Sequence, residues 1–360
     1  MTDDLTTSFY RTPGRAAGSN PHGRFDRLQR QAVDDGWTHE DDLPVLRTTV
    51  REERARQIIT KNSSPDLSFD RSINPYRGCE HGCIYCFARP SHACLGLSPG
   101  LDFETQLIAR PNAPEQLRRE LSHARYKPAT IAIGTNTDPY QPIERDRQIM
   151  RGVLQVLAEF NHPVAIVTKG TLIGRDADIL APMAAKGLVR VGISVTTLDP
   201  DTSRAMEPRV PLPKARLRVI RQLTDAGIPV RVMVSPVVPA LTDHELEAIL
   251  QAAADAGAVA ASSIVLRLPR EVASLFRDWL VECYPDRAAR VMGRVRELHG
   301  GRDYDPQFGQ RMTGSGEWAA MIRQRFRLAT RRLGLDRSLP PLRSDLFAPP
   351  PQKGDQLSLL

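Results

Sequence analysis

One stretch of the sequence decides the fold and the chemistry: Ser72-Ile73-Asn74-Pro75-Tyr76-Arg77-Gly78-Cys79-Glu80-His81-Gly82-Cys83-Ile84-Tyr85-Cys86. It places Cys79, Cys83 and Cys86 at the spacing C-x3-C-x2-C. Thiolates that lie so close together in sequence can point from one tight loop toward a single metal centre. Soft ligands of this kind select zinc, copper(I) or iron–sulfur clusters. The stretch therefore predicts that these three cysteines bind a metal.

The number of thiolates leaves two kinds of metal site open. A structural zinc ion takes four ligands, and the fourth could be His81, His92 or Cys94. An ordinary [4Fe–4S] cluster is also held by four cysteines. Three cysteines would leave one iron without a protein ligand, which suits chemistry better than structure.

The composition is that of a globular chain that needs no disulfide bonds. It has 360 residues, of which 41% are hydrophobic and 25% charged, enough for a sizeable core. Residues Met1–Leu5 lack the basic and apolar regions of a signal peptide. The sequence contains no run of about 18 apolar residues, so no membrane span is predicted. We expect a cytoplasmic protein, in which clustered cysteines favour metal binding over disulfides.

The positive charge is concentrated near the carboxyl terminus. The formal net charge is +7, and the segment Arg287–Arg337 contains 12 Arg, no Lys and 5 acidic residues, so it accounts for the whole excess. Such a segment can be the solvated face of helices. Clustered basic charge is also the electrostatic footprint of nucleic-acid binding, so we expect a nucleic acid as a partner of residues 287–337.

Short runs rich in Val and Ile alternate with amphipathic stretches from Leu67 onward. The runs predict buried parallel strands at Thr130–Gly134, Val164–Thr168, Val189–Val195, Val230–Val234 and Ala261–Leu266. The stretches between them predict helices at Arg145–Phe160, Asp176–Lys186, Lys214–Ala226 and His244–Ala256, the last with Thr242 or Asp243 as its N-cap. About six strand–helix units are too few for a closed barrel of eight. The predicted fold is therefore α/β, a partial (β/α)6 barrel of the TIM type.

We divide the chain into four parts. Residues 1–66 are an N-terminal extension that is partly loop, 67–285 the partial barrel, 286–338 a basic helical segment and 339–360 a Pro-rich flexible tail. Ligands in such sheets bind beyond the carboxyl ends of the strands. The cysteine loop and segments 134–140, 168–170, 194–197 and 235–239 should therefore share one rim.

The cysteine spacing, with an aromatic residue just before the last cysteine, resembles that of the radical S-adenosylmethionine (radical SAM) superfamily. The segments Asn74–Cys79 and Gly134–Pro142 resemble, more narrowly, the branch that includes the DNA repair enzyme spore photoproduct lyase. The resemblance implies a [4Fe–4S] cluster whose open iron binds SAM. It also implies reductive cleavage of SAM to a 5′-deoxyadenosyl radical, which abstracts hydrogen from substrate, and a reducing partner such as a flavodoxin or ferredoxin.

The same resemblance implies which residues contact SAM. Tyr85 would pack near the adenine, while Thr137 and Asp138, which follow Gly134, would reach the methionine moiety or the ribose. Lys169 would meet the SAM carboxylate and Ser194 would be a further polar contact. The residues alone leave a simpler alternative open for the Asp138 segment, which is an ordinary Asp-Pro turn.

One departure from that branch concerns the reaction. Spore photoproduct lyase returns hydrogen through a cysteine near the second motif, whereas Gly134–Tyr140 contains no cysteine. Of the remaining cysteines, Cys283 reads as a small hydrophobe, and Cys94 is a candidate donor or extra ligand. The lyase reaction is therefore not transferred to this chain.

The last residues suggest another partner. Gln356–Leu360 reads Gln-Leu-Ser-Leu-Leu and resembles the short peptides by which bacterial repair proteins dock on the DNA sliding clamp, with the Pro-rich stretch as tether. Three functions remain after these observations. They are a radical SAM enzyme acting on nucleic acid, one acting on a protein or small molecule, and a non-enzymatic metal-binding module.

Overall fold

The predicted α/β fold is confirmed by a computed structural model that describes residues 14–25 and 46–351. Within these residues the larger sheet has seven strands in the order β10–β9–β8–β7–β6–β3–β2. Its strands are β2 (Ile59–Lys61), β3 (Arg71–Ile73), β6 (Ile131–Ile133), β7 (Val164–Thr168), β8 (Val189–Ser194), β9 (Val230–Val237) and β10 (Ala260–Val265). The strands from β3 to β10 pair in parallel, and β2 pairs antiparallel with β3. The six parallel strands are those of a partial (β/α)6 barrel.

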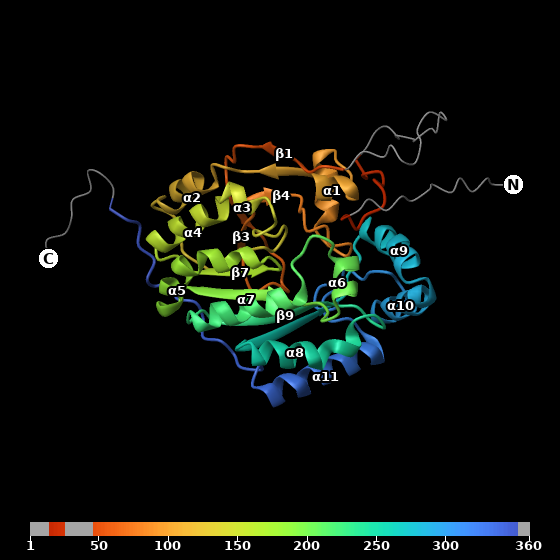
Figure 1. Cartoon of the computed structure of the whole chain (residues 1–360). Helices are drawn as coiled ribbons and strands as arrows, with labels where there is room; N and C mark the ends of the chain where they lie inside the picture. The colour runs from red at the N-terminus through yellow and green to blue at the C-terminus, as the bar shows by residue number, and fades with distance from the viewer. Residues whose placement is uncertain (1–13, 26–45, 352–360) are drawn as a thin grey trace.

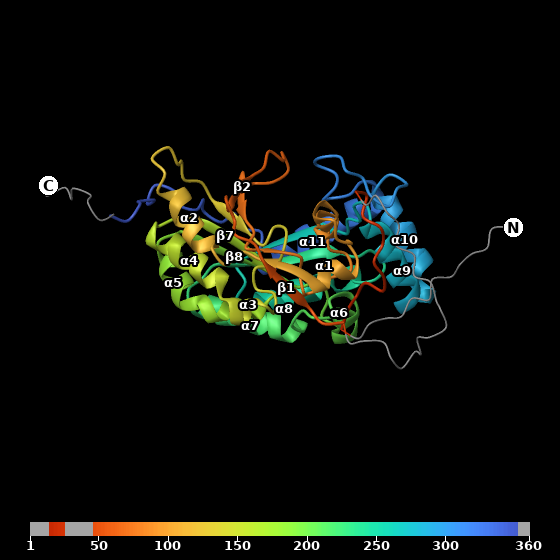
Figure 2. The ribbon, with the colours of Figure 1, turned by 90° about the horizontal axis from the view of Figure 1, so that it is seen from above.

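Helices of the described ranges lie between successive strands, and others follow the last strand, β10. They are α1 (Leu101–Thr105), α2 (Ala113–Leu121), α3 (Glu144–Arg147), α4 (Ile149–Glu159), α5 (Ala177–Ala185), α6 (Pro200–Met206), α7 (Pro213–Asp225), α8 (Leu246–Asp255), α9 (Val272–Cys283), α10 (Pro285–Leu298) and α11 (Gly316–Leu333). Short 3₁₀ helices span Arg89–Leu95, Thr171–Asp176 and Asp243–Glu245. In Figure 1 and Figure 2, α2, α4 and α5 stand at one end of the molecule and α9 and α10 at the other.

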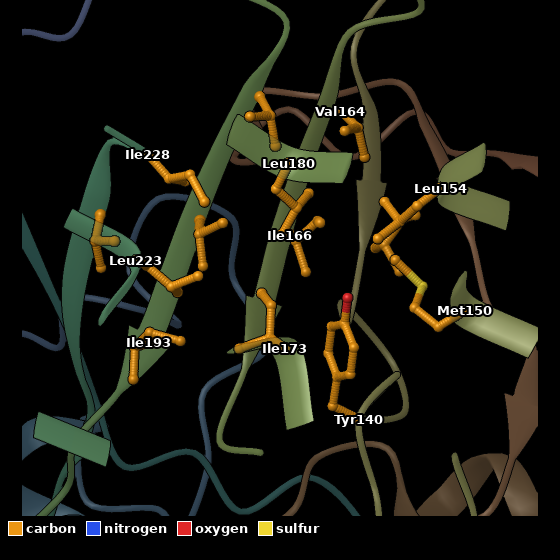
Figure 3. Close-up of a cluster of buried hydrophobic side chains, with 14 of the residues drawn as sticks. Tyr140, Met150, Leu154, Val164, Ile166, Ile173, Leu180, Ile193, Leu223 and Ile228 are labelled. Atoms are coloured by element: carbon orange, nitrogen blue, oxygen red, sulfur yellow. The ribbon is translucent and has the colours of Figure 1, made fainter. Parts of the chain in front are cut away.

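The main core fills the space between the sheet and these helices. Alternate residues of β7 and β8 are fully buried, and they meet apolar side chains of α4, α5 and α7 (Figure 3). Ile166 and Ile193 from the strands and Leu154, Leu180 and Leu223 from the helices have at most 1% of their surface exposed. Burial of one such side chain contributes about 1.5–3 kcal/mol. The helical layer therefore fixes the curvature of the sheet and the position of its carboxyl edge.

The predicted helix Arg145–Phe160 is wrong in one respect, because it is broken at Gln148. That residue has a φ of 49° and separates α3 from α4. The amide of Met150 donates instead to the carboxylate of Glu144 (3.1 Å), which Arg175 also holds (2.8 Å). A tertiary ion pair thus redirects the hydrogen bonds that would have continued the helix.

The predicted N-cap of the helix near His244 is also wrong. Helix α8 begins at Leu246 after a 3₁₀ turn, and neither Thr242 nor Asp243 caps it through its side chain. The hydroxyl of Thr242 accepts a hydrogen bond from the amide of Val238 (3.1 Å). It therefore shapes the loop after β9 rather than the start of α8.

The sheet reaches into the predicted N-terminal extension. Strand β2 lies within residues 1–66 and forms an edge of the main sheet. A second sheet in the described part of the chain has the order β1–β5–β4 and consists of β1 (Thr49–Glu52), β5 (Gln106–Ala109) and β4 (Tyr76–Arg77). Residues 46–66 are thus a structural part of the domain.

The carboxyl-terminal segment packs on the barrel. Ile322 and Ala329 of α11 are buried in the main core, and α11 lies along α8 (Figures 1 and 2). The described part of the predicted tail contacts the barrel. The ring of Phe347 packs against Tyr126 and His162, and the Ala348 amide donates to the Phe160 carbonyl. The predicted clamp peptide Gln356–Leu360 lies outside the described residues.

None of the helices in the described ranges combines the length and the apolar character needed to cross a bilayer.

Candidate functional site

The cysteine loop lies between β4 and the 3₁₀ helix Arg89–Leu95. Cys79 and Cys83 are buried, with 6% and 7% of their surface exposed, while Cys86 is half-buried. The loop is therefore largely covered by protein, and its third cysteine stands nearest the surface.

Two glycines give the loop its tight path. Gly78 and Gly82 have φ values of 74° and 68°, in the region that glycine adopts without strain. A Cβ at Gly78 would lie 2.7 Å from a methyl carbon of Leu107, and one at Gly82 would lie 2.7 Å from the carboxylate of Glu104. The chain can pass between these neighbours only without a side chain at either position.

A buried ion pair supports the cysteine loop. Arg89 and Glu104 have no exposed surface and meet at 2.6 Å. The same guanidinium donates to the carbonyls of Gly82 (2.9 Å) and Cys83 (3.0 Å). The Glu104 carboxylate also accepts the Ala17 amide (3.0 Å). Arg89 thus ties the cysteine loop to its own helix, and Glu104 ties it to the segment around residue 17.

The second motif, Gly134–Pro142, also supports the cysteine loop. The side chain of Gln141 accepts the Glu80 amide (2.8 Å) and donates to the Gly78 carbonyl (3.2 Å). The Thr137 hydroxyl donates to the Tyr76 carbonyl (2.8 Å). The two sequence motifs are therefore partners in space.

Gly134 places this motif against the neighbouring strand. Its φ is 86°, and a Cβ built there would lie 1.8 Å from the carbonyl oxygen of Val167 at the end of β7. Any side chain would push the loop away from β7. Gly134 therefore has a structural role in seating the motif, besides its predicted place among the SAM-contacting residues.

Asp138 joins three loops at this edge. Its carboxylate accepts the Thr168 hydroxyl (2.6 Å) and the Lys169 amide (2.8 Å), and it lies 3.3 Å from the His81 imidazole. Burial alone would raise the pKa of this carboxyl, but His81 and these hydrogen bonds outweigh it and lower the pKa to about 2. It also accepts the Tyr140 amide, so the Asp-Pro turn and an anionic anchor are both present.

Tyr85 and Lys169 belong to a buried charged network. The ammonium of Lys169 lies 5.6 Å from the centre of the Tyr85 ring, and the Tyr85 hydroxyl donates to Glu207. Glu207 also pairs with Arg216, and both side chains are fully buried. Burial alone would raise the pKa of Glu207, but Arg216 and Lys169 outweigh it and lower that pKa.

Arg216 extends the network to the end of β8. Its guanidinium donates to the Ser194 carbonyl (3.1 Å) and to the Ser203 hydroxyl (3.0 Å). The Thr196 hydroxyl donates to Glu207 (2.9 Å). Ser194 itself is buried at the carboxyl end of its strand.

The thiols fit a metal centre in their chemistry. Burial raises the pKa of Cys79 well above its usual value and that of Cys83 to about 12. The Asp138 carboxyl and the other two cysteines raise that of Cys79 further. Thiolates become stable in such surroundings when a cationic centre binds them. Among the described residues, no three His, Cys, Asp or Glu side chains already converge on one point as a single metal ion requires.

The proposed fourth ligands of a zinc ion have other surroundings. His81 faces Asp138. His92 approaches the Gln106 carbonyl through one ring nitrogen (2.9 Å) and packs edge-on against Phe103. Cys94 is exposed. The donor set thus fits a three-cysteine centre better than a closed site completed by His92 or Cys94.

The structure places all six predicted SAM-contacting residues at the carboxyl edge of the sheet: Tyr85, Gly134, Thr137, Asp138, Lys169 and Ser194. Tyr85, Asp138 and Lys169 share one network, whereas the Thr137 hydroxyl is engaged with backbone. Their contacts with SAM remain predictions.

Sequence reasoning missed the buried charged and polar side chains that support the site: Arg89, Glu104, Gln141, Glu207 and Arg216. One signal was available for Arg216, because it lies in phase with buried Ile220 and Leu223 on α7. A charged residue in an apolar helical stripe must find a buried partner.

Comparisons with known proteins agree with this geometry. Residues 73–253 match the family model described as the Radical SAM superfamily. An uncharacterized protein of Mycobacterium tuberculosis, Rv2578c, is 38% identical over 323 residues, which cover 84% of this chain and 93% of that protein. The uncharacterized protein MJ0683 of Methanocaldococcus jannaschii is 27% identical over 192 residues, 53% of this chain and 69% of that protein.

Among solved structures, spore photoproduct lyase complexed with dinucleoside spore photoproduct is similar with a TM-score of 0.57. The two sequences are 15% identical, with 79% of each chain covered, so the likeness concerns the fold. The family model covers the cysteine loop, the second motif and four of the six parallel strands, β6 to β9. The chain belongs to the radical SAM superfamily.

Proposed function

We propose that this chain is a radical SAM enzyme that holds a [4Fe–4S] cluster on Cys79, Cys83 and Cys86 and acts on nucleic acid. The observation that carries the proposal is the cysteine loop itself. Two glycines, the Arg89–Glu104 pair and the second motif hold it, with two thiols buried and Cys86 near the surface. When bound, the reduced cluster supplies the electron that cleaves SAM to a 5′-deoxyadenosyl radical, which takes hydrogen from substrate.

The chain's own residues bind and orient SAM and exclude water. Lys169 provides a cation whose pKa is raised, against the effect of burial, by Cys83, Glu207 and Asp138. That ammonium suits the carboxylate of SAM. Asp138 fixes the backbone on which Lys169 stands, and Glu207 holds the Tyr85 hydroxyl so that the ring faces Lys169. Such prearranged partners reduce the cost of ordering SAM when it binds.

Two features support a nucleic-acid substrate. The fold is that of spore photoproduct lyase, a protein solved with a dinucleoside photoproduct, and the positive charge is concentrated in 287–337. Several arginines there are already paired, such as Arg296 with Asp303 and Arg325 with Glu247. The remaining arginines provide the charge that phosphates require. A flavodoxin- or ferredoxin-like protein would supply the electron.

Anaerobic reconstitution with iron and sulfide tests this function directly. The dithionite-reduced protein should convert SAM to methionine and 5′-deoxyadenosine. A protein that retains one zinc ion per chain and leaves SAM intact would refute it and favour a structural metal module. Turnover with deuterated DNA, measured as label in 5′-deoxyadenosine, separates a nucleic-acid substrate from a protein or small molecule.

Asp138→Ala should weaken SAM binding more than it weakens cluster assembly. The change removes the anchor of the Thr168 hydroxyl and the Lys169 amide and leaves both donors without their partner. Loss of a buried acceptor costs about 1–3 kcal/mol, which corresponds to a roughly tenfold or greater loss of SAM affinity. Iron content and equilibrium dialysis with labelled SAM measure the two effects.

Asp178→Ala is the matched control for that change, because Asp178 is exposed on α5 and pairs with Arg151 at the surface. We expect it to leave SAM affinity unaltered. Wild-type SAM affinity in Asp138→Ala would contradict the positioning role of Asp138.

We also propose that Gln356–Leu360 docks on the DNA sliding clamp by inserting its leucines into an apolar pocket. A chain that ends at Gly354 should lose retention on immobilised clamp, whereas the full-length chain is retained. Equal retention of the two chains would contradict this proposal and would have no bearing on the proposed radical chemistry.

A further inference from the structure

The residue after the last cysteine is an exposed aromatic. Phe87 has 46% of its surface exposed and follows Cys86, the least buried of the three cysteines. The guanidinium of Arg267 lies 4.6 Å from the centre of the Phe87 ring. An aromatic face and a cation thus stand together beside the cysteine that lies nearest the surface.

Arg267 has no carboxylate partner of its own. Within the described residues its guanidinium forms neither a hydrogen bond nor an ion pair, and burial, opposed in part by Tyr304, lowers its pKa. A partly buried charge without a partner costs free energy. Its donors are therefore available to an incoming acceptor, and five N–H groups in a planar fork suit phosphate in particular.

Two further exposed aromatics repeat this pairing. Phe25 and Phe308 have 61% and 54% of their surface exposed. Arg24 stacks on Phe25 at 5.0 Å and Arg311 on Phe308 at 4.8 Å. These and Phe87 are the exposed large aromatic residues within the described ranges, and each has an arginine over its ring. Exposed aromatic residues indicate a binding surface when they lie near one another.

The three pairs are linked to one another through neighbouring residues. Arg24 donates to the carbonyl of Pro90 (3.2 Å), three residues past Phe87, and reaches Glu271 (3.5 Å), four residues past Arg267. On the other side, Arg311 and Arg267 both interact with Tyr304. We call Arg24, Phe25, Phe87, Arg267, Phe308 and Arg311 the arginine–phenylalanine rim.

The arginines of the rim differ in whether an acidic side chain pairs with them. Arg24 pairs with Glu271, and Arg311 is held by Asp66 at 2.6 Å. These ion pairs fix the outer arginines over their rings. Arg267 lies beside Phe87 and has no ion-pair partner among the described residues, since the Asp66 carboxylate that also acts on it electrostatically is bound by Arg311.

We propose that this rim binds unpaired nucleotides, with bases stacked on its phenylalanine and arginine faces and a phosphate on Arg267. The inference rests on the proposed nucleic-acid function and specifies its substrate as single-stranded or flipped-out. Flat faces at a surface stack on bases of any sequence, provided that those bases have left the duplex. The rim therefore selects unpaired nucleotides over intact duplex and brings them to the cysteine loop.

Fluorescence anisotropy with the full-length chain tests the rim. The probe is a labelled single strand of oligodeoxythymidine, about 16 nucleotides long to match a typical single-strand site, and a duplex of the same length competes. The wild-type chain should prefer the single strand. Phe87→Ala and Arg267→Gln should each weaken binding by about tenfold, as expected for one lost stacking contact or one lost phosphate contact.

Salt dependence separates the two kinds of contact. Arg267→Gln should reduce the slope of log affinity against log salt by about 0.7, the value for one phosphate of a single strand. Phe87→Ala should lower the affinity and leave the slope unchanged. A general loss of folding would not produce this difference, and circular dichroism melting of each variant checks it independently.

Two matched controls use exposed residues outside the rim and outside the basic segment 287–337. Arg218→Gln removes the same charge from α7, and Val281→Ala removes an exposed apolar side chain from α9. Both should bind like the wild-type chain. Equal weakening by Arg218→Gln and Arg267→Gln, equal binding of duplex, or no binding at low salt would each overturn the rim. SAM cleavage by the wild-type chain is measured without nucleic acid. A lack of cleavage would therefore contradict the proposed function independently of the result for the rim.

Discussion

Cys83→Ala is expected to abolish both cluster binding and SAM cleavage while most of the barrel stays folded. Cys83 supplies one of the three thiolates, and its backbone carbonyl still accepts the Arg89 guanidinium in the variant. The loop path therefore survives, but the centre loses a ligand that no nearby thiol replaces. Iron and sulfide content after reconstitution, the visible absorption of the cluster and the yield of 5′-deoxyadenosine should all fall to background.

The matched control for Cys83→Ala is Cys94→Ala. Cys94 is exposed in the 3₁₀ helix Arg89–Leu95, so the same change there should leave iron content and SAM cleavage intact. A Cys83→Ala protein that cleaves SAM at the wild-type rate would refute the ligand assignment. Loss of metal in Cys94→Ala would instead identify Cys94 as a fourth ligand.

Arg216→Met should give the largest loss of stability among single changes in α7. Arg216 is fully buried, and its removal leaves the Glu207 carboxylate unpaired in the same interior. Removal of one partner of a buried ion pair costs about 3–5 kcal/mol. The hydrogen bonds to the Ser194 carbonyl and the Ser203 hydroxyl are lost as well. Chemical denaturation followed by circular dichroism measures the change in the free energy of unfolding.

Arg218→Met, two residues away on the exposed face of α7, is the control for helix propensity and net charge. We expect it to alter the free energy of unfolding by less than about 0.5 kcal/mol. The double change Glu207→Gln with Arg216→Met should cost less than the sum of the two single changes, because the partners are coupled. Strict additivity, or equal stability of the two arginine variants, would show that the pair does not support the site.

Local sequence was enough to place the strands that build the barrel. Each predicted Val- and Ile-rich run is a strand, from β6 to β10, because a short β-branched run between turns is typical of a strand buried in a parallel sheet. The cysteine spacing and the second motif could also be read directly. Their functional residues lie on loops at strand ends, where parallel order brings them together.

The end of the predicted helix at Arg145–Phe160 and the supporting charges of the site could not be read in this way. The break at Gln148 arises because the Glu144 carboxylate, held by Arg175, takes an amide that a regular helix would use. Arg175 lies in another unit of the barrel, and no local pattern reports that contact. The same holds for Arg89 with Glu104 and for Glu207 with Arg216.

The sequence by itself determined the fold class, the three thiols and the loops at the strand ends that surround them, because periodicity and spacing are local properties of the chain. Only the tertiary structure decided that Gln141 and Asp138 contact the cysteine loop and that buried arginines support it. It alone brought Arg267 from the end of β10 over the ring of Phe87. Buried charges need partners, and those partners come from wherever the fold brings a matching group within hydrogen-bonding distance.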